Sequence, residues 1–274
     1  MRSLCLLVLA SLLLVACGGS VSRWTAEGDR LIRDNDLVGA EEAYNKAIAV
    51  DPHHGPALYG KGWALYLSGH DELKDAARQL FQRCIDYAPD YFGGYRGMGV
   101  LLMDEGKVAL AERMLRTAFD KDDQEPSTLV SLGQLYLAAD RYDEAERLFQ
   151  AAVALAPQRG EFMRYMAELE LARGAFDAAL AWIADGRSRP VSGKAGLLAL
   201  DEGELRIRLE QARILLERAT GPDDPGLGEA LQALDAADTL LQKAIQNDPR
   251  LRDVGPRQKF HNALRKRIVE TGQL

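Results

Sequence analysis

Hydrophobic residues recur every three or four positions in two stretches between Pro126 and Arg159. This spacing places them along one face of a helix, so each stretch predicts an amphipathic helix. Residues 139–141 form a short connection, and Pro157 ends the second helix because proline lacks an amide hydrogen. The pattern predicts a helical hairpin that cannot bury its apolar face alone and therefore needs neighbours.

The same pattern recurs along the chain. Hairpin units are predicted near residues 21–54, 55–91, 92–125, 126–159, 160–193 and 194–249. In the second unit, extra residues lengthen the turn at 68–72, where an insertion leaves the apolar stripe intact. One slot holds alanine in every unit. These alanines are Ala40, Ala77, Ala111, Ala145, Ala179 and Ala237.

The best-formed unit resembles the tetratricopeptide repeat (TPR) family. The residues that carry the resemblance are Leu129, Leu132, Gly133, Tyr136, Ala145, Phe149, Ala152 and Pro157. The resemblance implies an all-α fold, a right-handed TPR α-solenoid of about six helix hairpins over residues 23–249.

The sixth unit departs from the regular length. A helical pattern runs from Lys194 to Ala219, and a segment rich in Gly, Pro and Asp follows it at 220–226. This predicts an elongated hairpin that packs on itself through residues such as Leu209, Leu216, Leu227 and Leu234. Residues 250–274 predict a C-terminal helix that caps the stack with a polar face.

The N-terminus has the pattern of a secretion signal. A short apolar run follows Arg2, and small residues surround Cys17, whereas a membrane-spanning helix needs about 20 apolar residues. Leu14-Val15-Ala16-Cys17 resembles a bacterial lipobox, which implies cleavage of residues 1–16, lipidation of Cys17 and a short tether at 17–22. By the same resemblance, Gly18 favours the periplasmic face of the outer membrane over the inner membrane. The alternative is an ordinary signal peptide with a chance cysteine.

Charge and cysteine content exclude some partners. The chain carries 34 Lys+Arg and 41 Asp+Glu, a formal charge of −7, which argues against a nucleic-acid partner. Of the three cysteines, Cys5 leaves with the signal and Cys17 is acylated, so Cys84 has no disulfide partner. Helix packing must therefore supply the stability of the mature chain.

No motif indicates catalysis, a cofactor, a metal or a small-molecule substrate. The glycines of 186–194 lack the spacing of a phosphate loop, and the acidic stretch 120–125 lacks the glycine of a calcium loop. The four histidines are scattered, with only His53 and His54 adjacent. Cys84 takes a slot that holds alanine in other units, which favours a buried small residue over a nucleophile. We predict a protein that is not an enzyme.

A protein-binding groove is implied by the TPR resemblance, because the first helices of successive repeats line a concave surface in that family. An alternative is that some of these side chains only pack between neighbouring helices, or that the C-terminal helix fills the groove. Asp29, Trp63 and Val100 stand where a carboxylate clamp needs asparagine, which disfavours that mode. The slots that would face the groove hold Tyr59, Trp63, Tyr66, Arg96, Val100, Met103, Val130, Gln134, Leu137, Arg164 and Glu168.

The resemblance extends to the lipoproteins that help to assemble type IV or Tad pili and their secretins. It implies a lipid-anchored periplasmic scaffold, or adaptor, that binds envelope proteins and supports assembly of a membrane complex such as a pilus or secretion apparatus. Two alternatives are a periplasmic chaperone for unfolded clients and a non-catalytic subunit of a cell-wall enzyme complex. The repeats do not specify which partner is bound.

Overall fold

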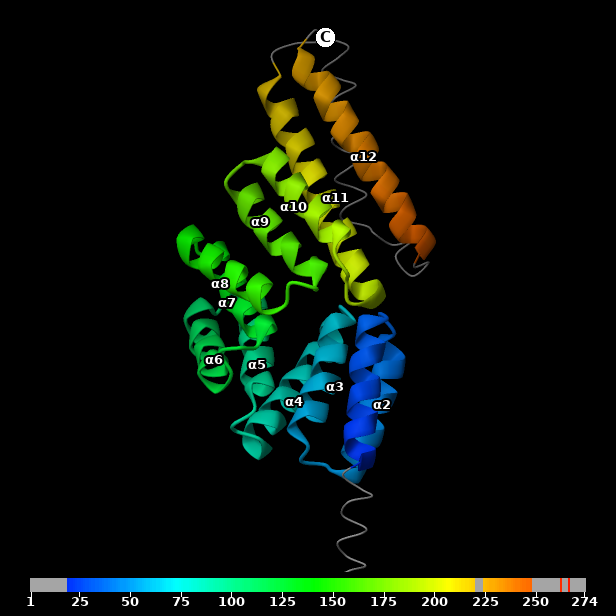
Figure 1. Ribbon diagram of the computed structural model, residues 1–274, viewed down its shortest axis with the longest axis vertical. Helices are drawn as coiled ribbons and strands as arrows, with labels where there is room; N and C mark the ends of the chain where they lie inside the picture. Colours follow the sequence, from blue (N-terminus) through cyan, green and yellow to red (C-terminus); the bar gives the residue numbers. More distant parts are fainter. Residues whose placement is uncertain (1–18, 220–223, 248–261, 263–265, 267–274) are drawn as a thin grey trace, which may run out of the picture. The chain divides into compact units, whose positions relative to one another are not determined.

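The computed structural model describes residues 19–219, 224–247, 262 and 266, and these residues form helices and turns without a β-strand. A first helix covers residues 19–33, so residues 19–22 of the predicted tether are helical, and antiparallel hairpins follow (Figure 1). The all-α fold of helix hairpins predicted from the sequence is confirmed. The further elements are α2 (Leu37–Val50), α3 (Gly55–Leu67), η1 (Asp71–Leu73), α4 (Lys74–Tyr87), α5 (Phe92–Asp104), α6 (Val108–Lys121), α7 (Pro126–Ala138), α8 (Tyr142–Leu155), η2 (Gly160–Phe162), α9 (Met163–Ala172), α10 (Phe176–Ser188), α11 (Gly193–Arg218) and α12 (Pro225–Asn247).

The chain divides into two compact units. Unit 1 extends to Ala156 and includes Gly193–Ala195, and unit 2 contains Pro157–Ser192 and the chain from Gly196 onward. Unit 1 therefore contains the helices up to α8. Unit 2 contains α9, α10 and the elongated hairpin of α11 and α12.

The turns inside successive hairpins share one backbone feature. Each turn contains a residue with positive φ. Residues other than glycine, asparagine and aspartate are disfavoured in that backbone conformation. The insertion predicted at 68–72 lies at one of these turns, and its last two residues are the first two of η1. The residues with positive φ at these turns are Asn35 (59°), Gly69 (73°), Gly106 (70°), Asp140 (56°) and Gly174 (76°).

Small residues bring the two helices of each hairpin close together. The alanines of the shared slot, Ala40, Ala77, Ala111, Ala145, Ala179 and Ala237, are all 0% exposed. A Cβ on Gly133 would lie 2.5 Å from the Phe149 ring, and one on Gly62 would lie 2.7 Å from the Phe81 ring. Glycine at position 133 therefore allows the two helices of its hairpin to approach closely.

The same large side chains also hold neighbouring hairpins together. The Tyr44 ring contacts Gly28 of its own hairpin and Gly60 of the next, where an added Cβ would lie 2.4 Å from the ring. Phe81 makes the equivalent contact with Gly97 of the next hairpin, where an added Cβ would lie 2.5 Å from the ring. We call these two contacts between hairpins the ring–glycine joints. Their geometry leaves no room for a side chain opposite the ring.

The third hairpin varies this arrangement. Leu115 replaces the aromatic ring, and a Cβ on Gly99 of the same hairpin would lie 2.7 Å from its side chain. One period after Gly97, the chain has Ser131 instead of glycine.

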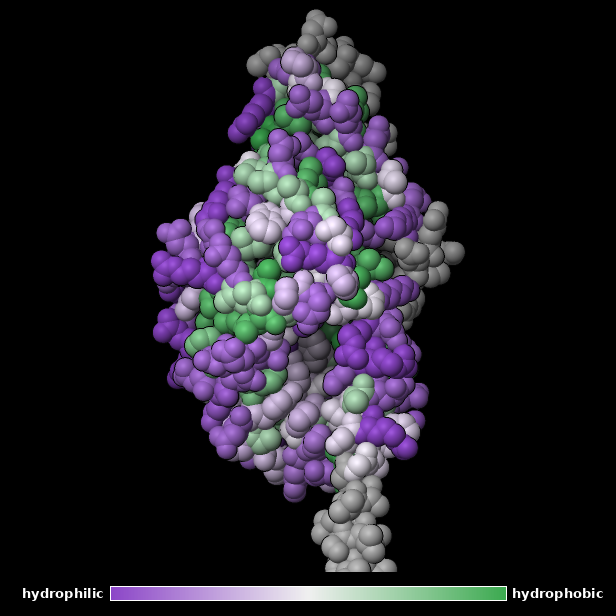
Figure 2. Space-filling model, in the orientation of Figure 1, coloured by the Kyte–Doolittle hydropathy of each residue, from purple (hydrophilic) through white to green (hydrophobic). Residues whose placement is uncertain are grey.

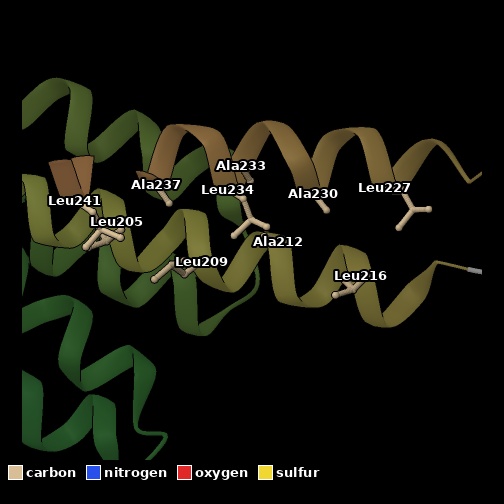
Figure 3. Close-up of a cluster of buried hydrophobic side chains, with 10 residues drawn as sticks. All are labelled: Leu205, Leu209, Ala212, Leu216, Leu227, Ala230, Ala233, Leu234, Ala237 and Leu241. Atoms are coloured by element: carbon tan, nitrogen blue, oxygen red, sulfur yellow. The ribbon is translucent and has the colours of Figure 1, made fainter. Parts of the chain in front are cut away.

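The elongated hairpin has a core of its own, built from α11 and α12 (Figure 3). Leucines dominate α11, and alanines at close spacing on α12 allow the two helices to approach. The predicted self-packing of Leu209, Leu216, Leu227 and Leu234 is confirmed, since these side chains are at most 6% exposed. The cluster contains Leu205, Leu209, Ala212, Leu216, Leu227, Ala230, Ala233, Leu234, Ala237 and Leu241.

Ion pairs connect this hairpin to α10. Asp201 on α11 is buried, and its carboxylate accepts from Arg187 Nη2 at 2.7 Å and lies 3.0 Å from Lys243 Nζ. A buried carboxylate needs such partners because desolvation of an unpaired charge is costly. Asp201 therefore fixes α10, α11 and α12 against one another within unit 2.

Three sequence predictions fall on residues outside this description. They are the signal peptide over residues 1–16, lipidation at Cys17 and, apart from Asn262 and Lys266, the C-terminal capping helix over 250–274.

Candidate protein-binding groove

Three first helices of consecutive hairpins, α3, α5 and α7, lie side by side in unit 1. This arrangement brings together the predicted groove positions of α3, α5 and α7. Figure 2 shows hydrophobic side chains exposed among hydrophilic ones on the face in view. We call the face formed by Tyr59, Trp63, Tyr66, Arg96, Val100, Met103, Val130, Gln134 and Leu137 the unit 1 groove.

Aromatic side chains form the α3 side of the unit 1 groove. Tyr59 and Trp63 stack with ring centres 6.1 Å apart, and Trp63 and Tyr66 follow at 5.1 Å. Tyr91 and Phe92, at the start of α5, extend the cluster, with ring centres 6.0 and 6.2 Å from that of Tyr59. Such contacts fix the rings, so a partner would meet a surface that loses little side-chain entropy on binding.

Arg96 links the three helices. Its Nε donates to the Ser127 carbonyl oxygen and to Ser131 Oγ, both at 3.1 Å and both on α7. Its Nη1 donates to the Tyr59 hydroxyl on α3. The guanidinium carbon lies 4.3 Å from the centre of the Trp63 ring. One side chain from α5 thus ties three successive hairpins together.

The charge of Arg96 is held in an unusual way. The side chain is only 8% exposed, yet no carboxylate of the described chain lies within ion-pair distance. Neutral oxygens and the face of Trp63 stabilise the cation instead, as expected for a guanidinium beside an indole ring. Arg96 therefore contributes rigidity and positive potential beneath the aromatic surface.

The tyrosines of the unit 1 groove stay neutral. Burial raises the pKa of Tyr59 above its usual value, although Arg96 acts in the opposite direction. Burial also raises the pKa of Tyr66, and the neighbouring Asp104 carboxylate adds to the shift. Both phenols therefore keep their protons at neutral pH and act as hydrogen-bonding groups without charge.

The remaining positions differ in how much surface they offer. Val100, Met103, Gln134 and Leu137 are half-buried, as are Tyr59, Trp63 and Tyr66. Val130 is 3% exposed and offers almost no surface. The accessible part of the unit 1 groove is thus an aromatic wall on α3 with apolar and amide groups on α5 and α7.

Arg164 and Glu168 belong to unit 2. Arg164 Nη1 donates to Glu168 Oε1 at 3.0 Å, and Arg206 of α11 lies 3.1 Å from the same oxygen. Glu168 is 9% exposed. These two predicted groove residues are engaged with each other and with the elongated hairpin.

Sequence reasoning missed the anchoring of Arg96 and the part played by Tyr91 and Phe92. Tyr91 and Phe92 precede the slots that the family pattern assigns to the groove. A run of two aromatic residues at a helix start was an available signal for an aromatic cluster. No equivalent signal linked Arg96 to Ser131, because that contact depends on the side-chain path between neighbouring hairpins.

Cys84 is a packing residue, as the sequence predicted. It is 0% exposed, its thiol donates to the Gly55 carbonyl oxygen at 3.3 Å, and burial raises its pKa to about 12. The described residues contain no cluster of His, Cys, Asp and Glu suited to a metal ion. None of the described helices is long and apolar enough to cross a membrane.

Comparison with known families decides the class of the chain. Two protein-family models, both described as tetratricopeptide repeat, match the chain. One matches residues 25–92 and 96–159, and the other matches residues 136–189. The chain is a tetratricopeptide repeat protein. The matched segments cover unit 1 almost entirely and extend through α10. The helix hairpins described above are thus TPR units, which form a protein-binding scaffold.

Solved structures show the same fold at low sequence identity. The APC/C hetero-tetramer Cut9–Hcn1 matches 89% of this TPR protein and 43% of that chain, with a TM-score of 0.62 and 17% identity. A thermophilic TPR protein of Thermus thermophilus matches 68% of this chain and 99% of its own, with a TM-score of 0.57 and 21% identity. PilF of Pseudomonas aeruginosa matches 85% of this chain and 94% of its own, with a TM-score of 0.50 and 14% identity.

One curated relative shares sequence over a short segment. The human protein O-mannosyl-transferase TMTC3 is 30% identical over 93 residues, which are 34% of this TPR protein and 10% of the relative. The chain therefore corresponds to a small part of that protein.

Proposed function

We propose that this TPR protein is a lipid-anchored periplasmic scaffold that binds envelope proteins and supports assembly of a membrane complex such as a pilus or secretion apparatus. The scaffold does not catalyse a reaction. Its partner is a protein that presents apolar side chains to the unit 1 groove. The anchor is an acylated Cys17 in the periplasmic face of the outer membrane.

The unit 1 groove carries the binding part of this proposal. Its aromatic side chains, Tyr59, Trp63 and Tyr66, are half-buried and lie outside the packing signature of the repeat. Aromatic residues supply much of the binding energy in protein interfaces. Helices or extended segments with apolar anchors suit a surface of this kind.

The anchoring part rests on sequence. A charged start, a short apolar run and Leu14-Val15-Ala16-Cys17 have the order of a lipoprotein signal. Each buried methylene of an acyl chain contributes about 0.8 kcal/mol to membrane binding, so two or three chains hold a protein firmly.

Substitution of Cys17 by serine should release the protein from membranes. We expect the protein with Cys17 to incorporate labelled palmitate and to fractionate with the outer membrane. The Cys17→Ser variant should lose both properties. Cys84→Ser is the matched control, because that thiol is buried in α4 and should not affect anchoring. A Cys17→Ser protein that still carries label would contradict the anchor.

Photo-crosslinking in cells tests the groove. A benzoylphenylalanine at Trp63 or Gln134 should capture one dominant envelope protein, because both side chains are half-buried on the unit 1 groove. The control position is Val108 on the second helix α6, which is 50% exposed. It should give no such adduct.

The pattern of adducts separates the alternatives. Many clients of unrelated sequence at Trp63 would favour a periplasmic chaperone, and a single cell-wall enzyme would favour a non-catalytic subunit of that enzyme. The groove proposal is wrong if the two groove positions give the same adducts as Val108.

A further inference from the structure

The first helix carries basic residues and a tryptophan on one side. Positions 23, 26, 27, 30 and 33 follow the spacing of a single helical face and line a shallow surface hollow together with Trp24. Lys46 of α2 joins this surface from the neighbouring helix. We call the surface formed by Arg23, Trp24, Arg30, Arg33 and Lys46 the N-terminal face.

Trp24 lies between two cations on this face. The Arg23 guanidinium carbon is 4.6 Å and the Lys46 Nζ is 4.7 Å from the centre of its ring. The ring is partly exposed, and its buried part packs against the core cluster that contains Val21 and Tyr44. A partly exposed tryptophan with flanking cations is typical of residues at the level of lipid headgroups.

The basic residues of the N-terminal face are only partly neutralised. Arg30 pairs with Glu27 at 2.7 Å and with Asp34 at 2.5 Å. For Arg23, Arg33 and Lys46, the described residues offer no carboxylate within 4.0 Å, and Lys46 has only a longer-range interaction with the Glu27 carboxylate, whose pKa is lowered mainly by the Arg30 side chain and in part by Lys46. In a chain with a formal charge of −7, this face is therefore a local source of positive potential.

The position of the face in the chain restricts where it can lie. Cys17 precedes the helical residue Gly19 by two residues. Two residues span at most about 7 Å, so an acylated Cys17 keeps the start of this helix within reach of the headgroups. A basic surface at this distance from an anionic bilayer is attracted to it.

We propose that the N-terminal face lies against the anionic bilayer surface and orients unit 1 on the membrane. This inference rests on the proposed acylation of Cys17. Lipid phosphates pair with Arg23, Arg33 and Lys46, and the Trp24 ring enters the interface. The acyl chains supply the anchor, and the N-terminal face sets which side of unit 1 meets the membrane.

Fluorescence quenching of single-tryptophan proteins tests this orientation. The acylated full chain with Trp63→Phe and Trp182→Phe keeps Trp24 alone, and it is reconstituted into vesicles of phosphatidylglycerol and phosphatidylcholine with brominated acyl chains. We expect strong quenching and a blue-shifted emission relative to vesicles without bromine. The matched protein that keeps only Trp63 should show neither change, because Trp63 lies on the unit 1 groove.

A charge variant and a labelling control complete the test. Adding Arg23→Gln, Arg33→Gln and Lys46→Gln to the protein that keeps Trp24 should reduce its quenching to the level seen for Trp63. Quenching of Trp24 no greater than that of Trp63, in a protein shown by mass spectrometry to be acylated, would overturn the inference and leave the anchor intact. Absence of the acyl group would instead overturn the proposed anchor.

Discussion

Gly97→Ala should lower the free energy of unfolding by roughly 1–3 kcal/mol, the usual cost of overpacking a core. The added Cβ would lie 2.5 Å from two ring carbons of Phe81. Phe81 is 0% exposed and also faces Gly62, so its ring has no free side to move toward. The hairpins on either side of the joint must therefore separate slightly. Urea denaturation followed by circular dichroism measures the change.

A second substitution shows whether the ring is the cause. Phe81→Leu alone should also destabilise the protein by opening a cavity, but with Gly97→Ala the added methyl group fills part of that space. The loss in free energy of unfolding of the double variant should be smaller than the sum of the two single losses, by on the order of 1 kcal/mol. Additive losses would contradict the ring–glycine joint.

Gly228→Ala is the matched control for the glycine substitution. Gly228 lies in α12, and an added Cβ would meet no atom within 4 Å. Alanine favours a helix more than glycine does, so stability should stay constant or rise slightly. A loss equal to that of Gly97→Ala would point to a general sensitivity of glycines and not to the joint.

Arg96→Met should lower the free energy of unfolding by roughly 1.5–3 kcal/mol, the range for a hydrogen bond to a charged group. Methionine preserves much of the volume but removes the donors to Ser127, Ser131 and Tyr59. It also removes the cation from the face of Trp63. We expect a lower urea midpoint, a change in tryptophan fluorescence, and weaker crosslinking from the groove.

Arg113→Met on α6 is the control for Arg96. Arg113 is exposed, and the described residues offer its side chain no ion-pair partner. Its replacement should leave stability nearly unchanged. A gain in stability for Arg96→Met would show that desolvation of the guanidinium outweighs its hydrogen bonds, which is a known outcome for buried charges. That result would remove the structural role assigned to Arg96.

The scaffold of this protein was readable from its sequence because each packing position tolerates few residue types. Ala40 and Ala145 are 0% exposed, so only a small side chain fits there. Gly133 faces Phe149 at a distance that excludes a Cβ. The same packing constraint acts in every hairpin. The same residue types therefore recur along the sequence at the length of one hairpin.

The groove was less predictable because its residues are free to vary. The slot pattern brought Trp63 and Gln134 onto the same face, but it did not separate Val130, which is buried, from its half-buried neighbours. Arg96 could have extended into solvent. Its long side chain instead reaches Ser131 of the next hairpin. This conformation depends on contacts between hairpins, which the sequence of a single repeat does not reveal.

The core of the elongated hairpin bears on the order in which the chain folds. Its apolar contacts join α11 and α12, which are consecutive in the chain and separated only by residues 219–224. The contacts nearest the turn, around Leu216 and Leu227, close a short loop and therefore cost less chain entropy than contacts between distant segments. We therefore expect amide hydrogen exchange to show this core opening separately from the joints in unit 1.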